Sequence, residues 1–294
     1  MQIGIAGTGK MGTAIAGRLI SLGHEVFVWN RTASNAAAAV GLGAKLVSSP
    51  HDLVESSEVV IGLLTDEAAL DQVYGGAQGL LSGAVNGKTL IEMSTVSPAK
   101  QIELGQRVQA AGGRYIECPV GGSIGPAKEG KLLGFVGGAA EDVAQVRPLL
   151  DQICRRVEHV GPHGSGAMMK LAINLPLMVY WQTLAEALSL IQPLGLDPKR
   201  VIDIFSETSG GPNVLKSRGS LVAQTLIDGQ ASNVNVTVGN LRKDLRSMIA
   251  QASTMGVQLP LAQESLNRFD ATAKAGLDGT DASEHLVYWL NQKS

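Results

Sequence analysis

One lysine in an apolar stretch is the first candidate for chemistry. Lys170 stands between Ala-Met-Met and Leu-Ala-Ile, and Asn174 follows four residues later. That spacing puts both side chains on one face of a predicted helix. A lysine that loses its water has a lowered pKa and can exchange a proton near neutral pH. The alternative is that Lys170 is an ordinary solvated charge, and the spacing alone does not decide between the two interpretations.

The histidines have no spacing to acids or to one another that would define a metal site. We therefore expect no metal in this chain, and we expect the histidines to lie in loops or at the surface. They are His24, His51, His159, His163 and His285, of which His163 adjoins the predicted boundary between domains.

A glycine-rich segment follows the first strand-like run and has the spacing GxGxxG. A helical pattern follows it, and a second strand-like run, EVFVW, comes at the distance that a dinucleotide fold requires. Such glycines allow a tight turn and a close backbone approach to a pyrophosphate at a helix N-terminus. A purely structural turn is the alternative. The predicted cofactor contacts here are Gly7, Thr8, Gly9, Lys10, Met11 and Gly12.

The residues at the end of the second strand indicate which dinucleotide is bound. Asn30 lies 18 residues after Gly12, where NAD sites usually have an acid for the ribose hydroxyls. Asn30 does not repel a 2′-phosphate, and the planar cation of Arg31 can bind one. With Thr32 beside them, these residues predict NADPH as the cofactor. A solvated turn arginine is the alternative for Arg31.

The order of apolar runs predicts the elements that position these residues. Up to about residue 161 short strand-like runs alternate with helical segments, which is typical of a parallel sheet with helices on both faces. The runs are IGIAG, EVFVWN, AKLVS, EVVIGLL, KTLIEM, RYIECPV, LLGFVGG and RRVEHVG. After residue 164 they cease and helical patterns continue to the end.

We therefore predict two domains. Residues 1–162 form an α/β Rossmann-type NADP-binding domain, and residues 163–294 form an all-α domain for substrate binding and dimerisation. A long interdomain helix over residues 165–192 joins them, because that segment is apolar nearly all round and follows the breaker sequence PHGSG.

Composition excludes several classes of partner. The 294 residues include 24 basic and 26 acidic ones, so the formal net charge is −2 and no charge block favours nucleic acid or a membrane surface. Two cysteines form no disulfide framework, and no basic region precedes an apolar core at the N-terminus. We expect a cytoplasmic protein.

Four further motifs in order make the chain resemble a known family over essentially its whole length. They are MSTVSP at residues 93–98, CPVGGSIGPAKEGKL at 118–132, GSGAMMKLAIN at 164–174 and LRKDL at 241–245. Together with IAGTGKMGTAIAGRL, they resemble the β-hydroxyacid dehydrogenases, which include 3-hydroxyisobutyrate dehydrogenase. The cofactor turn and the GAMMKLAIN segment are most similar to glyoxylate/succinic semialdehyde reductases.

The resemblance implies roles for residues that spacing alone does not assign. Lys170 matches the catalytic lysine, which is general acid in reduction, and Asn174 matches its companion. One implied group lies beside the cofactor, and a second binds the substrate, whose carboxylate is held by its glycine-rich loop. The first is Leu64, Thr65, Ser94, Thr95 and Lys243, and the second is Thr95, Gly121, Gly122, Ser123 and Asp244, with Lys170 and Asn174 also touching substrate.

The function implied is NADPH-dependent reduction of a small carboxylate-bearing aldehyde or keto acid, such as glyoxylate or succinic semialdehyde, by a homodimer. Many relatives have Ser where this chain has Gly121, and an aromatic residue where Val236 stands, so a bulkier substrate is allowed. Three alternatives stay open: an NAD-dependent dehydrogenase of the 3-hydroxyisobutyrate type, an imine reductase, and a noncatalytic NADPH-binding protein.

Overall fold

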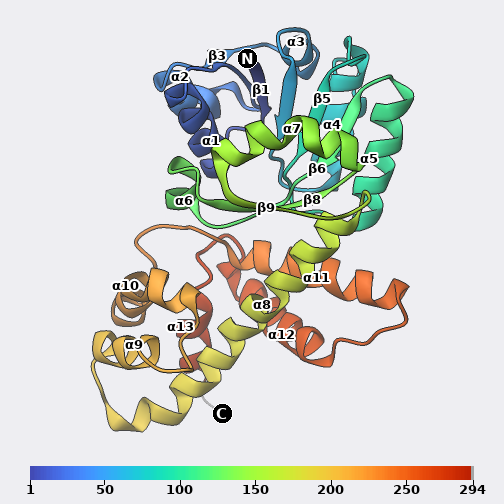
Figure 1. Ribbon diagram of the computed structural model, residues 1–294. Coiled ribbons are helices and arrows are strands. Elements are labelled where there is room, and N and C mark those ends of the chain that lie inside the picture. The colour runs from blue at the N-terminus through green and yellow to red at the C-terminus, as the bar shows by residue number, and fades with distance from the viewer. Residues whose placement is uncertain (293–294) are drawn as a thin grey trace. The chain divides into compact units, whose positions relative to one another are not determined.

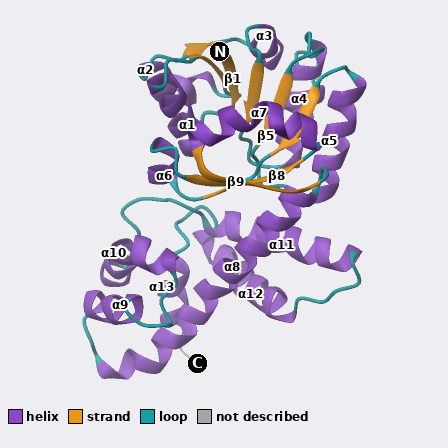
Figure 2. Cartoon of the chain, in the orientation of Figure 1, coloured by secondary structure: helices purple, strands orange, loops and turns teal. Residues whose placement is uncertain are grey.

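The computed structural model describes residues 1–292 and divides into two compact units, Met1–Lys170 and Leu171–Ser294. In Figure 1 the first unit runs from blue to green and the second from yellow to red. Each unit has its own hydrophobic core. The first contains a sheet with helices, and the second is built from helices (Figure 2).

The first unit contains a nine-stranded sheet in the order β3-β2-β1-β4-β5-β6-β8-β7, with β9 paired to β8. From β3 to β6 all neighbours are parallel, and the order 3-2-1-4-5-6 is that of a Rossmann fold. The predicted fold class is therefore confirmed. The strands are β1 (Gln2–Ala6), β2 (Glu25–Trp29), β3 (Lys45–Leu46), β4 (Val59–Gly62), β5 (Thr89–Glu92), β6 (Arg114–Glu117), β7 (Val120–Gly121), β8 (Leu132–Gly137) and β9 (Cys154–Gly161).

One part of the sheet differs from the predicted parallel arrangement. Strand β8 is antiparallel to both β6 and β7, and only its pairing with β9 is parallel. The connection from β7 to β8 is too short for the crossover that parallel strands need, so the chain turns back on itself. Helix α7 (Ala140–Ile153) then provides a full crossover from β8 to β9.

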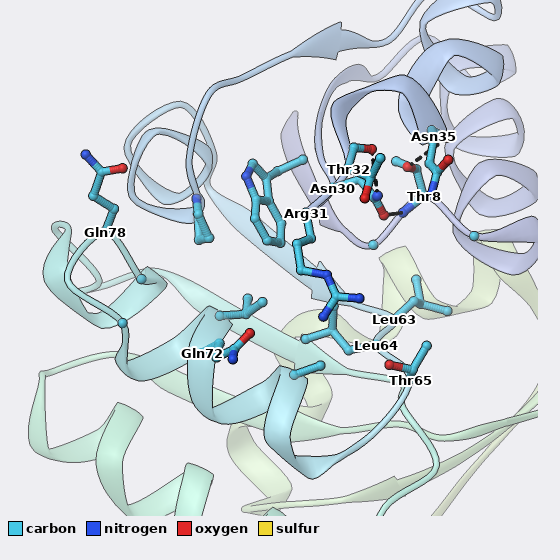
Figure 3. Close-up of a pocket in the computed structure, with 18 residues that line it drawn as sticks. Thr8, Asn30, Arg31, Thr32, Asn35, Leu63, Leu64, Thr65, Gln72 and Gln78 are labelled. Atoms are coloured by element: carbon cyan, nitrogen blue, oxygen red, sulfur yellow. Dashed lines mark hydrogen bonds between the residues drawn. The ribbon is translucent and has the colours of Figure 1, made fainter.

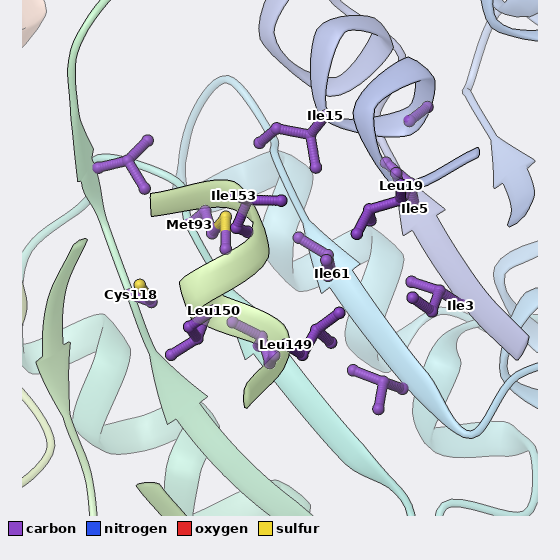
Figure 4. Close-up of a cluster of buried hydrophobic side chains, with 14 of the residues drawn as sticks. Ile3, Ile5, Ile15, Leu19, Ile61, Met93, Cys118, Leu149, Leu150 and Ile153 are labelled. Atoms are coloured by element: carbon purple, nitrogen blue, oxygen red, sulfur yellow. The ribbon is translucent and has the colours of Figure 1, made fainter. Parts of the chain in front are cut away.

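Alternation along the strands places helices on both faces of the sheet. In β1, Ile3 and Ile5 enter one core cluster while Ala6 enters another. The first cluster includes residues of α1 (Lys10–Ser21) and α7, as Figure 4 shows. The second includes residues of α3 (Pro50–Glu55), α4 (Glu67–Gly75) and α5 (Pro98–Ala110). This unit also contains two short α-helices, α2 (Ala37–Gly41) and α6 (Ile124–Lys128).

Helix α8 (Ser165–Ile191) confirms the long helix predicted over residues 165–192. The division into compact units falls inside it, after Lys170, and the domain boundary at 162/163 stays a prediction. In the second unit the regular secondary structure of the described residues is helical, with one isolated bridge between Thr237 and Asp281. None of the helices over residues 1–292 is long and apolar enough to cross a bilayer. The α-helices that follow α8 are α9 (Pro198–Ser206), α10 (Asn213–Asp228), α11 (Val238–Thr254), α12 (Pro260–Thr272) and α13 (Glu284–Leu290).

The expectation that every histidine lies in a loop or at the surface is wrong for His285. This residue of α13 is fully buried, with Nδ1 2.7 Å from the Thr272 hydroxyl and Nε2 2.8 Å from the Gln182 side-chain oxygen. Its ring lies 4.3 Å from that of Phe269. Burial lowers the pKa of His285 to about 4, because the charged form would lose its hydration.

We predict that the second unit loses stability in acid because of His285. The unfolded histidine takes up a proton near pH 6.5 and the folded one only near pH 4, so stability falls as pH drops through that window. At pH 4, the lower end of this window, the free energy of unfolding has fallen by about 3 kcal/mol. Urea unfolding at several pH values should show this slope in the wild type and a smaller slope in His285→Gln. Equal slopes in both proteins would contradict the assignment.

Candidate functional site

The three glycines of the GxGxxG loop have different surroundings. Gly7 has φ +101°, and a Cβ there would overlap the carbonyl oxygen of Leu63. A Cβ on Gly12 would overlap the carbonyl oxygen of Gly7. Gly9, by contrast, would place its Cβ in open space, with no atom within 4 Å. Gly7 and Gly12 are therefore required by the protein's own packing, whereas Gly9 leaves space that a ligand can occupy.

That open space is part of a cavity of about 610 Å³ in the first unit. Such a volume is suited to a nucleotide-sized ligand. The lining comes from the loop after β1, the turn after β2, the segment after β4, and helix α4 with the loop beyond it (Figure 3). The cavity brings together these residues singled out from the sequence: Gly7, Thr8, Gly9, Asn30, Arg31, Thr32, Leu64 and Thr65.

The Asn30 side chain holds two parts of the cavity together. Its Oδ1 accepts a hydrogen bond from the backbone N–H of Thr8 at 3.2 Å, and its Nδ2 donates to the carbonyl of Thr32 at 2.9 Å. The Thr8 hydroxyl in turn donates to the carbonyl of Asn35 at 3.1 Å. In Figure 3 the guanidinium of Arg31 extends from this turn towards Leu64. The turn thus brings a cation into the cavity and no carboxylate.

Several lining residues escaped the sequence analysis. Two of them, Gln72 on α4 and Gln78 in the loop after it, bring polar side chains to the cavity. No motif marks them, because the amide of a glutamine suits a cavity wall as well as any exposed surface. The remaining lining residues are Trp29, Asn35, Pro50, Leu63, Ala69, Val73, Gly76 and Gly79.

A buried acid organises the segments that follow β4 and β5. Glu92, the last residue of β5, accepts a hydrogen bond from the Ser94 N–H at 2.8 Å and one from the Tyr74 hydroxyl at 2.9 Å. The Ser94 hydroxyl oxygen accepts from the N–H of Leu64 at 2.7 Å. Burial raises the pKa of Glu92. Ser94 thus fixes the backbone of a cavity residue, and neither it nor Thr95 lines this cavity.

A second buried acid, Glu117 at the end of β6, contacts the start of α8. Its Oε1 accepts from the N–H of Gly166 at 2.8 Å and its Oε2 from the N–H of Ala167 at 3.3 Å. Burial raises the pKa of this carboxyl to about 7, and the hydrogen bonds from backbone N–H groups oppose that rise. Glu117 could not be singled out from the sequence, since nothing in the RYIECPV run shows which distant backbone groups its carboxylate meets.

The glycine segment after β7 has the features of a tight turn. Gly122 has φ +128°, and Ser123 precedes α6 without a side-chain cap bond. A Cβ on Gly121 would meet only ordinary contacts, the nearest being 3.4 Å from the ring of Phe135. The space beside Gly121 therefore accommodates a Cβ.

The remaining predicted site residues belong to helices. Lys10, Met11 and Gly12 form the first turn of α1 and do not line the cavity. Lys170 ends the first unit, whereas Asn174, one turn further along α8, belongs to the second. Two others lie on α11, where Lys243 Nζ is 3.3 Å from Asp244 Oδ1. The roles predicted for these residues stay predictions.

Comparison with known proteins accounts for nearly the whole chain. Residues 2–161 match the family described as the NAD binding domain of 6-phosphogluconate dehydrogenase. Residues 164–289 match the one described as NAD-binding of NADP-dependent 3-hydroxyisobutyrate dehydrogenase.

Individual relatives agree with these matches. The chain is 32% identical to 3-hydroxyisobutyrate dehydrogenase of Pseudomonas aeruginosa, over 96% of each protein. It is 29% identical to glyoxylate/succinic semialdehyde reductase 2, chloroplastic, of Arabidopsis thaliana, over 96% of this chain and 78% of that protein. A solved structure of Psf3 in complex with NADP+ and 2-OPP is 26% identical, with a TM-score of 0.85 over 97% of this chain and 99% of that one.

The fold, the glycine loop and these similarities define the class: the protein is an NAD(P)-dependent oxidoreductase acting on hydroxyl or carbonyl groups. The chain belongs to the β-hydroxyacid dehydrogenase family.

We predict that Gly9→Ala weakens cofactor binding, whereas Gly12→Ala lowers the stability of the fold. Gly9 has φ −63°, which alanine adopts freely, and its added methyl meets no protein atom, so stability should be nearly unchanged. NADPH binding should weaken about tenfold or more, because the methyl occupies the ligand's space. Gly12→Ala should instead lower the melting temperature. Thermal unfolding and NADPH fluorescence titration test both, and undiminished binding in Gly9→Ala would mean that the open space holds no cofactor.

Proposed function

We propose that this protein is an NADPH-dependent reductase of small aldehydes or keto acids that carry a carboxylate, and that it forms the hydroxy acid. The observation that carries the choice of cofactor is the turn after β2, where Arg31 lines the cavity and Asn30 replaces the acid usual in NAD sites. A guanidinium forms paired, charge-assisted hydrogen bonds with a phosphate, and an absent carboxylate leaves nothing to repel it.

The proposed chemistry needs a proton donor and a binding site for the acid group. When bound, the reduced nicotinamide supplies a hydride to the carbonyl carbon. Lys170 donates a proton from its ammonium group to the carbonyl oxygen, and the side-chain amide of Asn174 orients the lysine or the substrate. The family resemblance supports both assignments. Ser94 and Thr95 pass beside the nicotinamide, and Lys243 assists in cofactor binding.

The substrate carboxylate is assigned to the turn Gly121–Ser123, and Thr95 and Asp244 are assigned to substrate binding. Backbone N–H groups of a turn with positive φ can converge on an anion, and Gly122 has such a φ. Because Gly121 has no hydroxyl, this chain relies on backbone groups and Ser123 where many relatives add a serine side chain. Glyoxylate and succinic semialdehyde are the proposed test substrates, since relatives carry those names.

Three alternatives make different demands on the chain. An NAD-dependent 3-hydroxyisobutyrate-type dehydrogenase would favour an acid where Asn30 stands. An imine reductase usually has another residue in place of Lys170, and a noncatalytic NADPH-binding protein has no need of that lysine. A panel of glyoxylate, succinic semialdehyde and related aldehydes, each with NADPH and NADH, separates the proposed reductase from the dehydrogenase and from the noncatalytic protein. Tight NADPH binding without turnover on any substrate would favour the noncatalytic protein.

We also propose a cytoplasmic homodimer with a domain boundary at 162/163. The resemblance supports pairing through the helical domain. Light scattering would give the oligomeric state directly.

We predict that Arg31→Ala lowers kcat/KM with NADPH by about 10- to 100-fold and leaves kcat/KM with NADH nearly unchanged. The lost charge-assisted hydrogen bonds are each worth about 1.5–3 kcal/mol. Steady-state kinetics with both cofactors measures the ratio. The matched control is Arg155→Ala, an exposed arginine of β9 outside the cavity. If Arg31→Ala left the ratio of kcat/KM with NADPH to kcat/KM with NADH unchanged, the cofactor assignment would be wrong.

We predict that Lys170→Ala lowers kcat by about 10²- to 10⁴-fold, the usual contribution of a positioned proton donor. NADPH affinity should be retained, because the cavity residues are untouched. The control is Lys199→Ala, an exposed lysine of α9. Turnover in Lys170→Ala close to that of the wild type would refute the proposed mechanism.

A further inference from the structure

A buried carboxylate closes the N-terminus of the helix that carries Lys170, and all the atoms involved belong to the first unit. Glu117 is fully buried and accepts hydrogen bonds from Gly166 and Ala167, in the first turn of α8. The first N–H groups of any helix lack partners within the helix, and negative charge there is favourable. Glu117 provides both an acceptor and a charge, from a strand some fifty residues earlier in the chain.

Glycines on two sides confine this carboxylate. Gly137, the antiparallel register partner of Glu117 on β8, leaves no space for a Cβ, which would overlap Oε1. A Cβ on Gly166 would overlap the carbonyl oxygen of Phe135 and lie 3.2 Å from Cδ of Glu117. Strand β8, Glu117 and the start of α8 are thus packed as closely as their backbones allow. A displacement of the carboxylate therefore displaces the helix end.

We infer that Glu117 is a positioning residue for Lys170, setting where the lysine's helical turn lies and how firmly it is held. The inference rests on the proposed function of Lys170 as proton donor. Lys170 is four residues beyond Gly166, which is one turn and about 6 Å along the axis. Because proton transfer requires donor and acceptor within about 3 Å, small displacements of that turn change the rate.

Protonation of Glu117 would weaken this hold. A carboxylate offers a charged acceptor oxygen to each of the two N–H groups, whereas protonation removes the charge and leaves one of the two oxygens as a weaker acceptor. The carboxyl with its pKa near 7 is ionised at pH 8 and largely protonated at pH 6. We therefore expect turnover to fall below about pH 7 because of this group.

Other titratable groups surround Glu117 and need separate variants. Glu92 is its register partner on β5, and Tyr115 and Cys118 are its neighbours at the end of β6. Burial contributes to raising the pKa of Tyr115 and of Cys118 well above their usual values, so both stay neutral near pH 7. In the loop before α8, His163 Nε2 lies 2.8 Å from the carbonyl oxygen of Tyr115. In the part of α8 that belongs to the first unit, Ser165 to Lys170, the charged residue is Lys170.

The test compares Glu117→Gln with the wild type between pH 6 and pH 8. Glutamine keeps the shape but has one carbonyl oxygen and one NH2 group at every pH, so one of the two backbone N–H groups loses its acceptor. We expect kcat to fall at least tenfold at pH 8, the acid limb near pH 7 to disappear, and the Kd for NADPH to stay within twofold. Glu117→Asp, which keeps the charge, should retain part of kcat and the acid limb.

Two controls separate positioning from general damage. Asp197→Asn makes the same chemical change at the N-terminus of α9, where Asp197 caps the N–H of Arg200, and should leave kcat unchanged. His163→Gln should preserve the acid limb. Wild-type kcat in Glu117→Gln, or an acid limb that survives in it and vanishes in His163→Gln, would overturn the inference.

A double-mutant cycle and hydrogen exchange distinguish this failure from failure of the proposed function. In a Lys170→Ala background Glu117→Gln should cost no further activity, and an undiminished tenfold loss there would mean that Glu117 acts without the lysine. Hydrogen exchange of residues 165–170, corrected for intrinsic rates, should accelerate in Glu117→Gln and not in Asp197→Asn. If Lys170→Ala turns over normally, the proposed function fails, whereas unaccelerated exchange refutes the hold of Glu117 on the helix.

Discussion

The backbone N–H groups that a helix cannot satisfy at its own N-terminus are the constraint on which the site depends. Helices α4 and α5, which follow β4 and β5, satisfy one such group with Asp66 and Ser97. Helix α1, which follows β1, has Gly9 as its N-cap residue, with no side-chain cap and with open space beside it. Helix α8 is held by Glu117. The same unmet donors thus face open space at one helix and a buried carboxylate at another.

The two buried acids act in parallel ways because they occupy equivalent places in the sheet. Glu92 and Glu117 are register partners at the ends of β5 and β6, and each accepts a backbone N–H from the segment it holds. Each also faces a glycine on a neighbouring strand, Gly62 or Gly137, where a Cβ would overlap a carboxylate oxygen. At the ends of both strands, therefore, a buried carboxylate fills the space beside a glycine of the neighbouring strand. Each carboxylate also accepts a hydrogen bond that fixes a loop or a helix.

The ionised form of Glu117, which holds the start of α8, lowers the free energy of unfolding. Glu117 has a higher pKa folded than unfolded, so the folded protein holds more protons between about pH 4.5 and 7. Its contribution to the free energy of unfolding therefore falls as pH rises through that window. His285 acts with the opposite sign in the second unit, where stability falls as pH drops. Burial raises the pKa of an acid and lowers that of a base, so one physical cause gives opposite pH slopes in the two units.

Sequence reasoning succeeded where the signal is local and failed where it depends on a distant partner. The glycine loop, the strand-like runs and the turn at Arg31 were predictable because each needs only residues close in sequence. Glu117 and His285 were not, because their partners lie 49 and 103 residues away. Asn30 combines a local signal with a contact that only the structure shows. Its type predicted the lack of an acid, yet only the structure shows its amide joining Thr8 to Thr32, which requires an acceptor and a donor in one side chain. An aspartate there would keep the acceptor for Thr8 but lose the donor to Thr32, so a change of charge at this position also loosens the turn that presents Arg31.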